Sequence, residues 1–327
     1  MAVILTVTLN AALDVTYATG EVAWGGTNRV RAVRRRAGGK GVNVARVAAT
    51  LGHPVLATGL AGGSTGDLIR NDLDHAGIRH DFSSVKGTSR STLAVVGGAE
   101  TTLFNEAGPC IDAAEWDAFL DHYRSLLPEA DVVVLSGSLP PGVPDDAYAV
   151  LASMATAPVI IDADGAALSA GVRERPALVK PNAEELARAT GESSPVAGAQ
   201  ALRAAGARAV LVSLGPDGML AVTPDGTWRA TPPGPMAGNP TGAGDAAVAA
   251  AAVALTADTS APDARPVPGA PAVRDAQAAR ESWTALLRHA VALSAAAVRA
   301  PVAGDYDAAA YTRLLPEIVI EGDPCPS

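Results

Sequence analysis

The stretch from residue 132 to residue 213 contains four short apolar runs, Val132-Val-Val-Leu135, Val159-Ile-Ile-Asp162, Ala177-Leu-Val-Lys180 and Ala209-Val-Leu-Val-Ser213. Runs of this length, rich in β-branched residues, are typical of strands buried on both faces. Helix-like segments lie among them, at residues 145–155, 183–190 and 196–205. Alternating strands and helices require crossover connections, which predict a parallel sheet with helices on both faces.

The same alternation extends toward the N-terminus. Strand-like runs occur at residues 3–9 and 55–60, and helix-like segments occur at 42–51, 67–75 and 113–127. We therefore expect a doubly wound α/β fold with a mainly parallel sheet, forming a single domain over residues 1–327.

Two segments do not fit the alternation. Residues 29–36 are strand-like and basic, and residues 91–96 with 101–105 have the pattern of a hairpin around Gly97-Gly98. We expect a small separate sheet, a discontinuous lid drawn from residues 11–37 and 89–107, over one end of the main sheet. Residues 256–273 are rich in Pro, Ala and Asp, which predicts an extended surface loop without an assigned function.

Composition narrows the classes of function. The 327 residues carry a formal net charge of −9, and 48% of them are hydrophobic. This acidic balance does not fit a general nucleic-acid binder, so we interpret the arginines of residues 29–36 as a solvated strand face. Cys110 and Cys325 lie too far apart to suggest a disulfide framework or a zinc site. We see no basic leader and no membrane-spanning run, and we expect a cytoplasmic protein with no membrane partner.

The segment Thr241-Gly-Ala-Gly-Asp245 opens an apolar run that continues to Leu255. A loop that enters a helix presents unpaired backbone N–H groups and the positive end of the helix dipole, which suit an anion. Asp245 in the first turn can act as a base toward a hydroxyl group. A simpler interpretation is a capped helix with an acid in its first turn. A dinucleotide-binding fold requires a preceding strand, and the proline-rich residues 231–240 do not provide one.

Two further motifs lie near the N-terminus. Gly38-Gly-Lys-Gly-Val-Asn43 is a second glycine-rich entry into a helix, with a cation at Lys40 and an amide at Asn43. It is not a Walker A loop, and its alternative interpretation is a flexible turn. Asp14 follows the first strand, where open α/β sheets bind ligands, although Asp is also an ordinary turn residue.

Two other motifs follow predicted strands in the second half of the chain. In Lys180-Pro-Asn-Ala-Glu-Glu185, Asn182 and Glu185 lie one helical turn apart and could order a hydrated Mg²⁺, or could simply start a helix. Ser213-Leu-Gly-Pro-Asp-Gly218 is either a tight β-turn or a flat surface for a nucleotide.

The order of these motifs, with Ser136-Gly-Ser-Leu-Pro-Pro-Gly142 between them, resembles that of the ribokinase-like (PfkB) sugar kinases. The branch most similar to the chain contains 1-phosphofructokinase and tagatose-6-phosphate kinase, and the resemblance runs from about residue 3 to about residue 300. It implies an ATP-dependent kinase with a doubly wound domain and a β lid that often forms a homodimer contact. A departure is Ala11, where the family usually has proline.

The resemblance also implies roles for individual residues. Asp245 would be the general base, and the amides of Ala243 and Gly244 would form the anion hole, in the catalytic turn that begins at Gly242. The substrate site would contain Asp14, Gly38, Gly39, Lys40, Asn43, Arg90 and Ser138. The ATP site would contain Lys180, Asn182, Glu185, Ser213, Gly215 and Gly218, with Asn182 and Glu185 placing Mg²⁺ through water.

These roles favour transfer of the ATP γ-phosphoryl group to a phosphorylated ketohexose of the fructose 1-phosphate or tagatose 6-phosphate type. Lys40 and Arg90 would hold the phosphate that the sugar already carries. Arg90 carries most of this distinction, because relatives with neutral substrates also have the lysine. The alternatives are a kinase for an unphosphorylated sugar, amino sugar or nucleoside, and a non-catalytic sugar or nucleotide sensor.

Overall fold

The computed structural model describes residues 2–97, 100–259 and 276–324. Its main sheet has the strand order β14-β13-β12-β11-β10-β9-β8-β1-β4-β5. Neighbouring strands are parallel from β11 to β5, while β12, β13 and β14 add an antiparallel edge. The strands are β1 (Ile4–Thr8), β4 (Val55–Gly62), β5 (His80–Val85), β8 (Val132–Ser136), β9 (Val159–Asp162), β10 (Leu178–Val179), β11 (Val210–Ser213), β12 (Met219–Val222), β13 (Gly226–Thr231) and β14 (Val319–Pro324).

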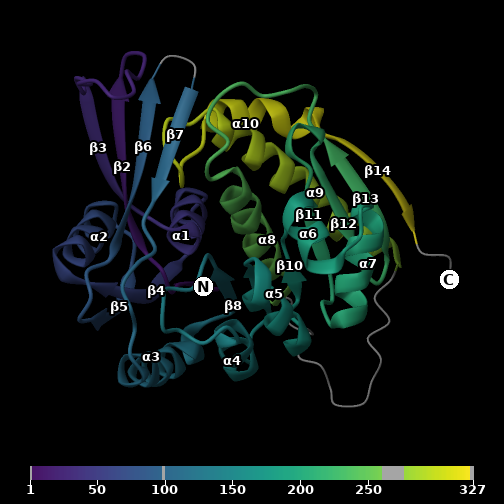
Figure 1. Ribbon diagram of the computed structural model, residues 1–327. Helices are drawn as coiled ribbons and strands as arrows, with labels where there is room; N and C mark the ends of the chain where they lie inside the picture. Colours follow the sequence, from purple (N-terminus) through teal and green to yellow (C-terminus); the bar gives the residue numbers. More distant parts are fainter. Residues whose placement is uncertain (1, 98–99, 260–275, 325–327) are drawn as a thin grey trace.

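Helices cover both faces of this sheet (Figure 1). One face packs against α1 (Lys40–Thr50), α2 (Gly63–His75), α8 (Ala243–Thr259), α9 (Ala276–Val298) and α10 (Ala308–Leu314). The other face packs against α3 (Ala113–Leu126), α4 (Ala147–Met154), α5 (Gly165–Gly171), α6 (Ala183–Thr190) and α7 (Pro195–Ala205). Side chains alternate between the two cores along each strand, as Ile4 and Leu5 do on β1. The expected doubly wound α/β class is confirmed.

A second sheet of strand order β3-β2-β6-β7 stands at one end of the main sheet (Figure 1). It contains β2 (Ala12–Thr19), β3 (Ala32–Gly38), β6 (Arg90–Gly97) and β7 (Glu100–Asn105). β6 and β7 form the predicted hairpin, and β2 pairs with β3 in antiparallel and with β6 in parallel. The arginines at positions 29, 31, 34 and 35 are exposed, as expected of a solvated strand face. We call this sheet the lid.

One boundary predicted from the sequence was wrong. α8 continues to Thr259, so residues 256–259 belong to this helix and not to the surface loop expected at 256–273. The apolar residues before them extend the helix, and alanine at position 257 favours it. Residues 260–273 of that expected loop lie outside the described residues. In the part of the chain described, no helix is both long and apolar enough to cross a membrane.

Candidate functional site

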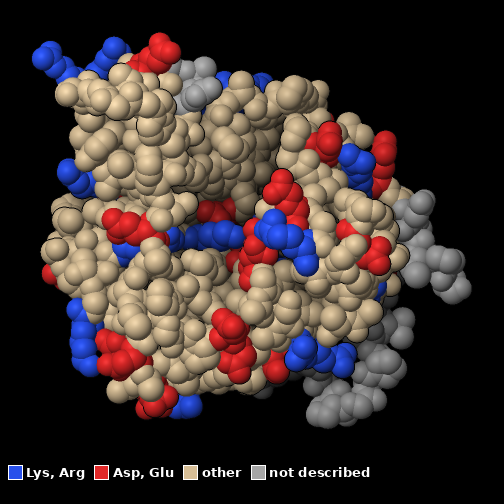
Figure 2. All heavy atoms as spheres, in the orientation of Figure 1, with Lys and Arg blue, Asp and Glu red and all other residues tan. Residues whose placement is uncertain are grey.

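The candidate site lies where neighbouring parallel strands end. Thr8, Ser136 and Asp162 are the last residues of β1, β8 and β9, and Lys180 follows β10; all four are buried. α1 and α8 pack against each other and against these strands. Parallel sheets bind ligands at the carboxyl ends of their strands, so the fold brings these polar groups to the expected edge. The space-filling view shows a groove across this face in which basic and acidic side chains gather (Figure 2).

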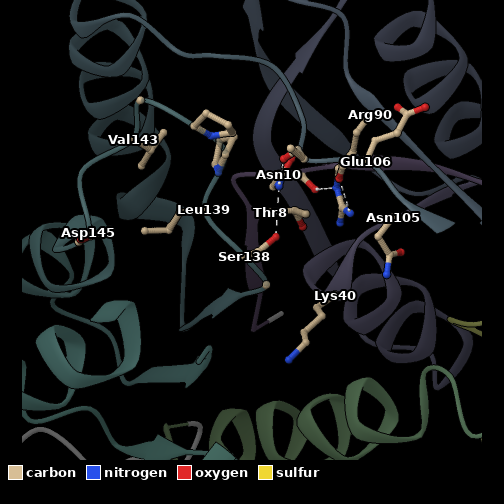
Figure 3. Close-up of a pocket in the computed structure, with 15 residues that line it drawn as sticks. Thr8, Asn10, Lys40, Arg90, Asn105, Glu106, Ser138, Leu139, Val143 and Asp145 are labelled. Atoms are coloured by element: carbon tan, nitrogen blue, oxygen red, sulfur yellow. Dashed lines mark hydrogen bonds between the residues drawn. The ribbon is translucent and has the colours of Figure 1, made fainter. Parts of the chain in front are cut away.

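A cavity of about 730 Å³ opens between this edge and the base of the lid. Its lining includes Thr8, Asn10, Lys40, Arg90 and Ser138, which come from four separate segments of the chain (Figure 3). A volume of this size accommodates a small polar ligand such as a sugar phosphate.

The turn that begins α8 holds Asp245 inside the protein. Gly242 has a φ of 89°, and a Cβ atom there would lie 3.0 Å from Cα of Ala303, so glycine is required at this position. The amide of Ala243 donates to the carbonyl of Pro240 at 3.2 Å. The amide of Gly244 belongs to the first helical turn, whose N–H groups have no intrahelical partner, and it remains a candidate anion donor.

Asp245 is only 6% exposed, and its carboxylate accepts a hydrogen bond of 2.8 Å from Nδ2 of Asn43 on α1. Burial raises the pKa of Asp245 to about 6, and the nearby negative charge of Asp162 adds to this effect. The hydrogen bond from Asn43 and the charges of Lys40 and Lys180 oppose this rise, because each of them lowers the pKa. A carboxylate with a pKa near 6 is ionised at neutral pH and well matched to accept a proton.

Lys40 and Lys180 share one buried carboxylate. Oδ1 of Asp162 lies 3.2 Å from Nζ of Lys40 and 3.3 Å from Nζ of Lys180. Lys180 is 4% exposed and lies beside the turn at Gly242–Gly244, since a Cβ atom on Gly244 would be 3.2 Å from its Nζ. The two ammonium groups therefore adjoin the place where α8 begins.

Asn182 and Glu185 form a capping box at the start of α6. Oδ1 of Asn182 accepts from the amide of Glu185 at 2.8 Å, and Oε2 of Glu185 accepts from the amide of Asn182 at 2.9 Å. The two residues thus start a helix, as the simpler interpretation of this motif predicted. The other oxygen of Glu185, Oε1, lies 4.0 Å from Nζ of Lys40 and faces the site.

Arg90 is held by two backbone carbonyls at the base of the lid (Figure 3). Its Nε donates to the carbonyl of Asn10 at 3.1 Å, and one terminal nitrogen donates to that of Glu106 at 3.4 Å. The side chain of Asn10 donates to the carbonyl of Ala107 at 3.0 Å and to Oγ of Ser138 at 3.2 Å. These contacts fix a guanidinium group at the wall of the cavity.

Asp14 lies on β2, opposite Arg36 and Thr92 on the neighbouring lid strands. A Cβ atom on Gly38 would overlap its carboxyl group, so glycine makes room for this side chain. Burial raises the pKa of Asp14 to about 6, and the charge of Arg90 lowers it. Gly39, with a φ of 101°, is the residue before α1 and lies against Thr8.

The remaining predicted residues lie along the turn between β11 and β12. Ser213 ends β11 and forms an isolated bridge with Asn182, so this turn adjoins the start of α6. Gly215 has open space on its side-chain face, whereas a Cβ atom on Gly218 would lie 2.0 Å from the carbonyl oxygen of Ala230. The open face at Gly215 leaves room for a flat ligand, and Gly218 is needed for packing.

Comparison with protein families places the chain among known enzymes. The model of the pfkB family of carbohydrate kinases matches residues 7–307. The chain belongs to this family. The glycine-rich turn at Gly242 and the lid both lie within the matched region of this carbohydrate kinase.

Several solved structures resemble this kinase over nearly its whole length. Phosphofructokinase-2 from Escherichia coli, solved in complex with fructose-6-phosphate, is 28% identical and covers 97% of this chain and 99% of its own, with a TM-score of 0.81. That enzyme has also been solved in a tetrameric inhibited form. A provisionally assigned phosphofructokinase from Staphylococcus aureus is 26% identical over 98% of this chain and 99% of its own, with a TM-score of 0.77. A Thermotoga maritima protein, described as a possible 1-phosphofructokinase, is 24% identical over 98% and 99%, with a TM-score of 0.78, and shows the shared fold.

Two residues of the candidate site were given no role from the sequence. Asp162 lies between Lys40 and Lys180, and the signal for it was an acid directly after the buried run Val159–Ile161. Asn10 connects the end of β1 with Ala107 and Ser138. Its amide looks like that of an ordinary turn residue until the distant partners are known.

Proposed function

We propose that this pfkB-family kinase transfers the γ-phosphoryl group of ATP to a hydroxyl of a phosphorylated ketohexose of the fructose 1-phosphate or tagatose 6-phosphate type. The observation that carries the proposal is the placement of the ionisable Asp245 at the start of α8, near a cavity lined by Lys40 and Arg90. A base and two separate cations match a sugar with a free hydroxyl at one end and a phosphate at the other.

Asp245 would act as the general base. Its carboxylate accepts the proton of the sugar hydroxyl, and the hydroxyl oxygen forms a bond to the γ-phosphorus while the bond to the β–γ bridging oxygen breaks and ADP leaves. Asn43 orients the carboxylate through its hydrogen bond. The amide of Gly244 and the ammonium of Lys180 beside it would stabilise negative charge on the transferred group.

Arg90 and Lys40 would bind the phosphate already on the sugar, and Asp14 and Ser138 would accept hydrogen bonds from its hydroxyl groups. The open face at Gly215, next to Ser213 and the start of α6, is proposed to receive the nucleotide.

The start of α6 fits a hydrated Mg²⁺ and does not fit a direct protein cage. The capping box uses Oδ1 of Asn182 and Oε2 of Glu185, which leaves Oε1 of Glu185 facing the site. Among the described residues no group of three or more His, Cys, Asp or Glu side chains is arranged to hold a metal. Asn182 and Glu185 would therefore hold the ion through water, as Mg²⁺ prefers. When bound, Mg²⁺ offsets the charge of the phosphate oxygens.

The lid is proposed to carry a homodimer contact. Val33 on β3 and Phe104 on β7 are exposed apolar residues on the same face of the lid, and Trp24 is exposed in the connection between β2 and β3. An apolar surface of this kind on a small sheet favours burial against another copy of the chain.

An ATP-consumption assay tests the proposed function. The panel contains fructose 1-phosphate, tagatose 6-phosphate, fructose 6-phosphate, free hexoses, an amino sugar and a nucleoside. We expect turnover with a ketohexose phosphate and a 10²- to 10⁴-fold lower kcat for Asp245→Asn, with ATP binding retained. Turnover with neutral sugars alone would favour the alternative kinase, turnover with none of them a sensor, and near-normal turnover of Asp245→Asn would exclude the proposed base.

A further inference from the structure

Asp162 is a buried carboxylate that the proposed mechanism does not use. It ends β9 and is fully buried, and each of its oxygens has a partner. Oδ1 receives Lys40 at 3.2 Å and Lys180 at 3.3 Å, and Oδ2 accepts from Oγ of Ser136 at 3.1 Å. Burial works against its ionised form, but the two lysines and Ser136 hold the pKa of Asp162 below its usual range. It therefore remains a permanent negative charge inside the site.

The two lysines reach the same oxygen of Asp162 from different elements. Lys40 begins α1 and borders the sugar cavity, with 38% of its side chain exposed. Lys180 follows β10 and lies against Gly244 in the catalytic turn. Both ammonium groups are thus close enough to attract Asp245, which is the residue after Gly244.

Asp245 nevertheless has a neutral partner. Its hydrogen bond comes from the amide of Asn43, and among the described residues it forms no ion pair. A base that is paired with an ammonium group is a weaker proton acceptor, since the opposite charge stabilises its ionised form. The arrangement keeps both cations near the phosphate path without neutralising the base.

We infer that Asp162 is a positioning residue, the counter-ion that holds Lys40 and Lys180 together and away from Asp245. This inference rests on the proposed role of Asp245 as the base. It gives Asp162, a residue outside the predicted motifs, the task of keeping Asp245 basic, while Lys180 stays available to the transferred phosphoryl group and Lys40 to the phosphate that the sugar carries.

The charges that face Asp245 support this role. Asp14 on β2 and Asp162 on β9 are negative, Lys40 on α1 and Lys180 after β10 are positive, and Asn43 on α1 is neutral. Burial contributes most to the raised pKa of Asp245 and Asp162 comes next, while Asn43, Lys40 and Lys180 act in the opposite direction. Removal of the charge at Asp162 would lower the pKa of Asp245 in two ways. It removes a repulsive negative charge, and it frees two cations to approach Asp245.

The experiment compares the pH dependence of kcat in the parent and in Asp162→Asn. In the parent, kcat should fall as the pH drops through about 6, because the base becomes protonated. In Asp162→Asn, the lysines turn to Asp245, so this acid limb should move down by about one pH unit. The plateau should fall by up to about tenfold, because a base whose pKa is one unit lower is a weaker proton acceptor.

Lys40→Met should shift the pKa of Asp245 in the opposite direction. Loss of this cation removes an attraction on Asp245, so the acid limb should move to higher pH. Because the side chain of Lys40 is partly exposed, this substitution should disturb the fold less than Asp162→Asn does. Asp164→Asn is the matched control, since Asp164 lies two residues beyond Asp162 and pairs with Arg188 at the surface. It should leave the limb and the plateau unchanged.

A second readout does not need turnover. Titration of the Asp245 carboxyl by ¹³C NMR should give a lower pKa in Asp162→Asn and a higher one in Lys40→Met. An unchanged pKa of Asp245 in both variants would overturn the inference. It would also be overturned if Asp162→Asn kept the acid limb of the parent and only required more Mg²⁺, because that result would assign Asp162 to the metal. Absence of turnover by the parent on every sugar of the panel would instead contradict the proposed function.

Discussion

At the scale of single residues, the cavity depends on side chains whose positions are fixed by the backbone. Arg90 is the clearest example, because two carbonyls from different segments hold its guanidinium group at the wall. A pre-positioned cation loses little conformational entropy when it binds a phosphate. This residue is therefore where the choice between a sugar phosphate and a neutral sugar should be measurable.

We expect Arg90→Ala to raise KM for the preferred sugar phosphate by 10- to 100-fold, in line with the loss of a charge-assisted contact of about 1.5–3 kcal/mol. The KM for ATP should stay within about twofold, since Arg90 borders the cavity that we propose for the sugar. Steady-state kinetics with each substrate varied in turn measures both values. Arg79→Ala is the control, because this arginine pairs with Glu129 on the surface. An unchanged KM for the sugar phosphate would favour the neutral-sugar kinase.

At the scale of elements, the parts that could be predicted from the sequence are those with a single strong pattern. Strands such as β8 and β9 are buried on both faces and read as continuous apolar runs. The antiparallel strands β12 and β13 were missed. In β13 (Gly226–Thr231), buried positions alternate with partly or fully exposed ones, and the segment contains glycine and arginine, so it does not form one continuous apolar run. Lys40 and Asp162 were not paired in advance because 122 positions separate them, and only the sheet order brings them together.

The lid is the element whose surface carries a prediction about assembly. Phe104 on β7 is 49% exposed, and Trp24 before β3 is 74% exposed. Sedimentation velocity should show the parent as a dimer, and Phe104→Lys should shift it toward monomer, because a charge in an apolar contact costs several kcal/mol. Val196→Lys on α7 is the control, since this residue is similarly exposed but lies far from the lid in the fold. A monomeric parent, or an unchanged dimer in Phe104→Lys, would contradict a lid-mediated dimer.

At the scale of the whole molecule, the candidate base should cost the protein stability. Burial raises the pKa of Asp245 from 3.8 to about 6, so between these pH values the folded chain binds a proton that the unfolded chain does not. Stability then falls as the pH rises through this window, and the full penalty, on the order of 3 kcal/mol, is present at pH 7. Asp14, whose pKa is raised in the same direction by burial, adds to the trend. A buried charge that lowers stability in this way is consistent with a role in chemistry and not in folding.

Asp245→Asn should therefore be more stable than the parent, while its kcat is about 10²- to 10⁴-fold lower. Asparagine keeps the shape of the side chain and can still accept the hydrogen bond from Asn43, while the buried charge is gone. Urea unfolding should give a higher midpoint for the variant at pH 7.5, and the difference should shrink at pH 4.5, where the carboxyl of the folded parent is already protonated. Asp117→Asn, at an exposed position of α3, should show no such gain. A variant less stable than the parent at pH 7.5 would mean that the ionised carboxylate supports the fold, and the loss of activity could then no longer be assigned to the loss of a base.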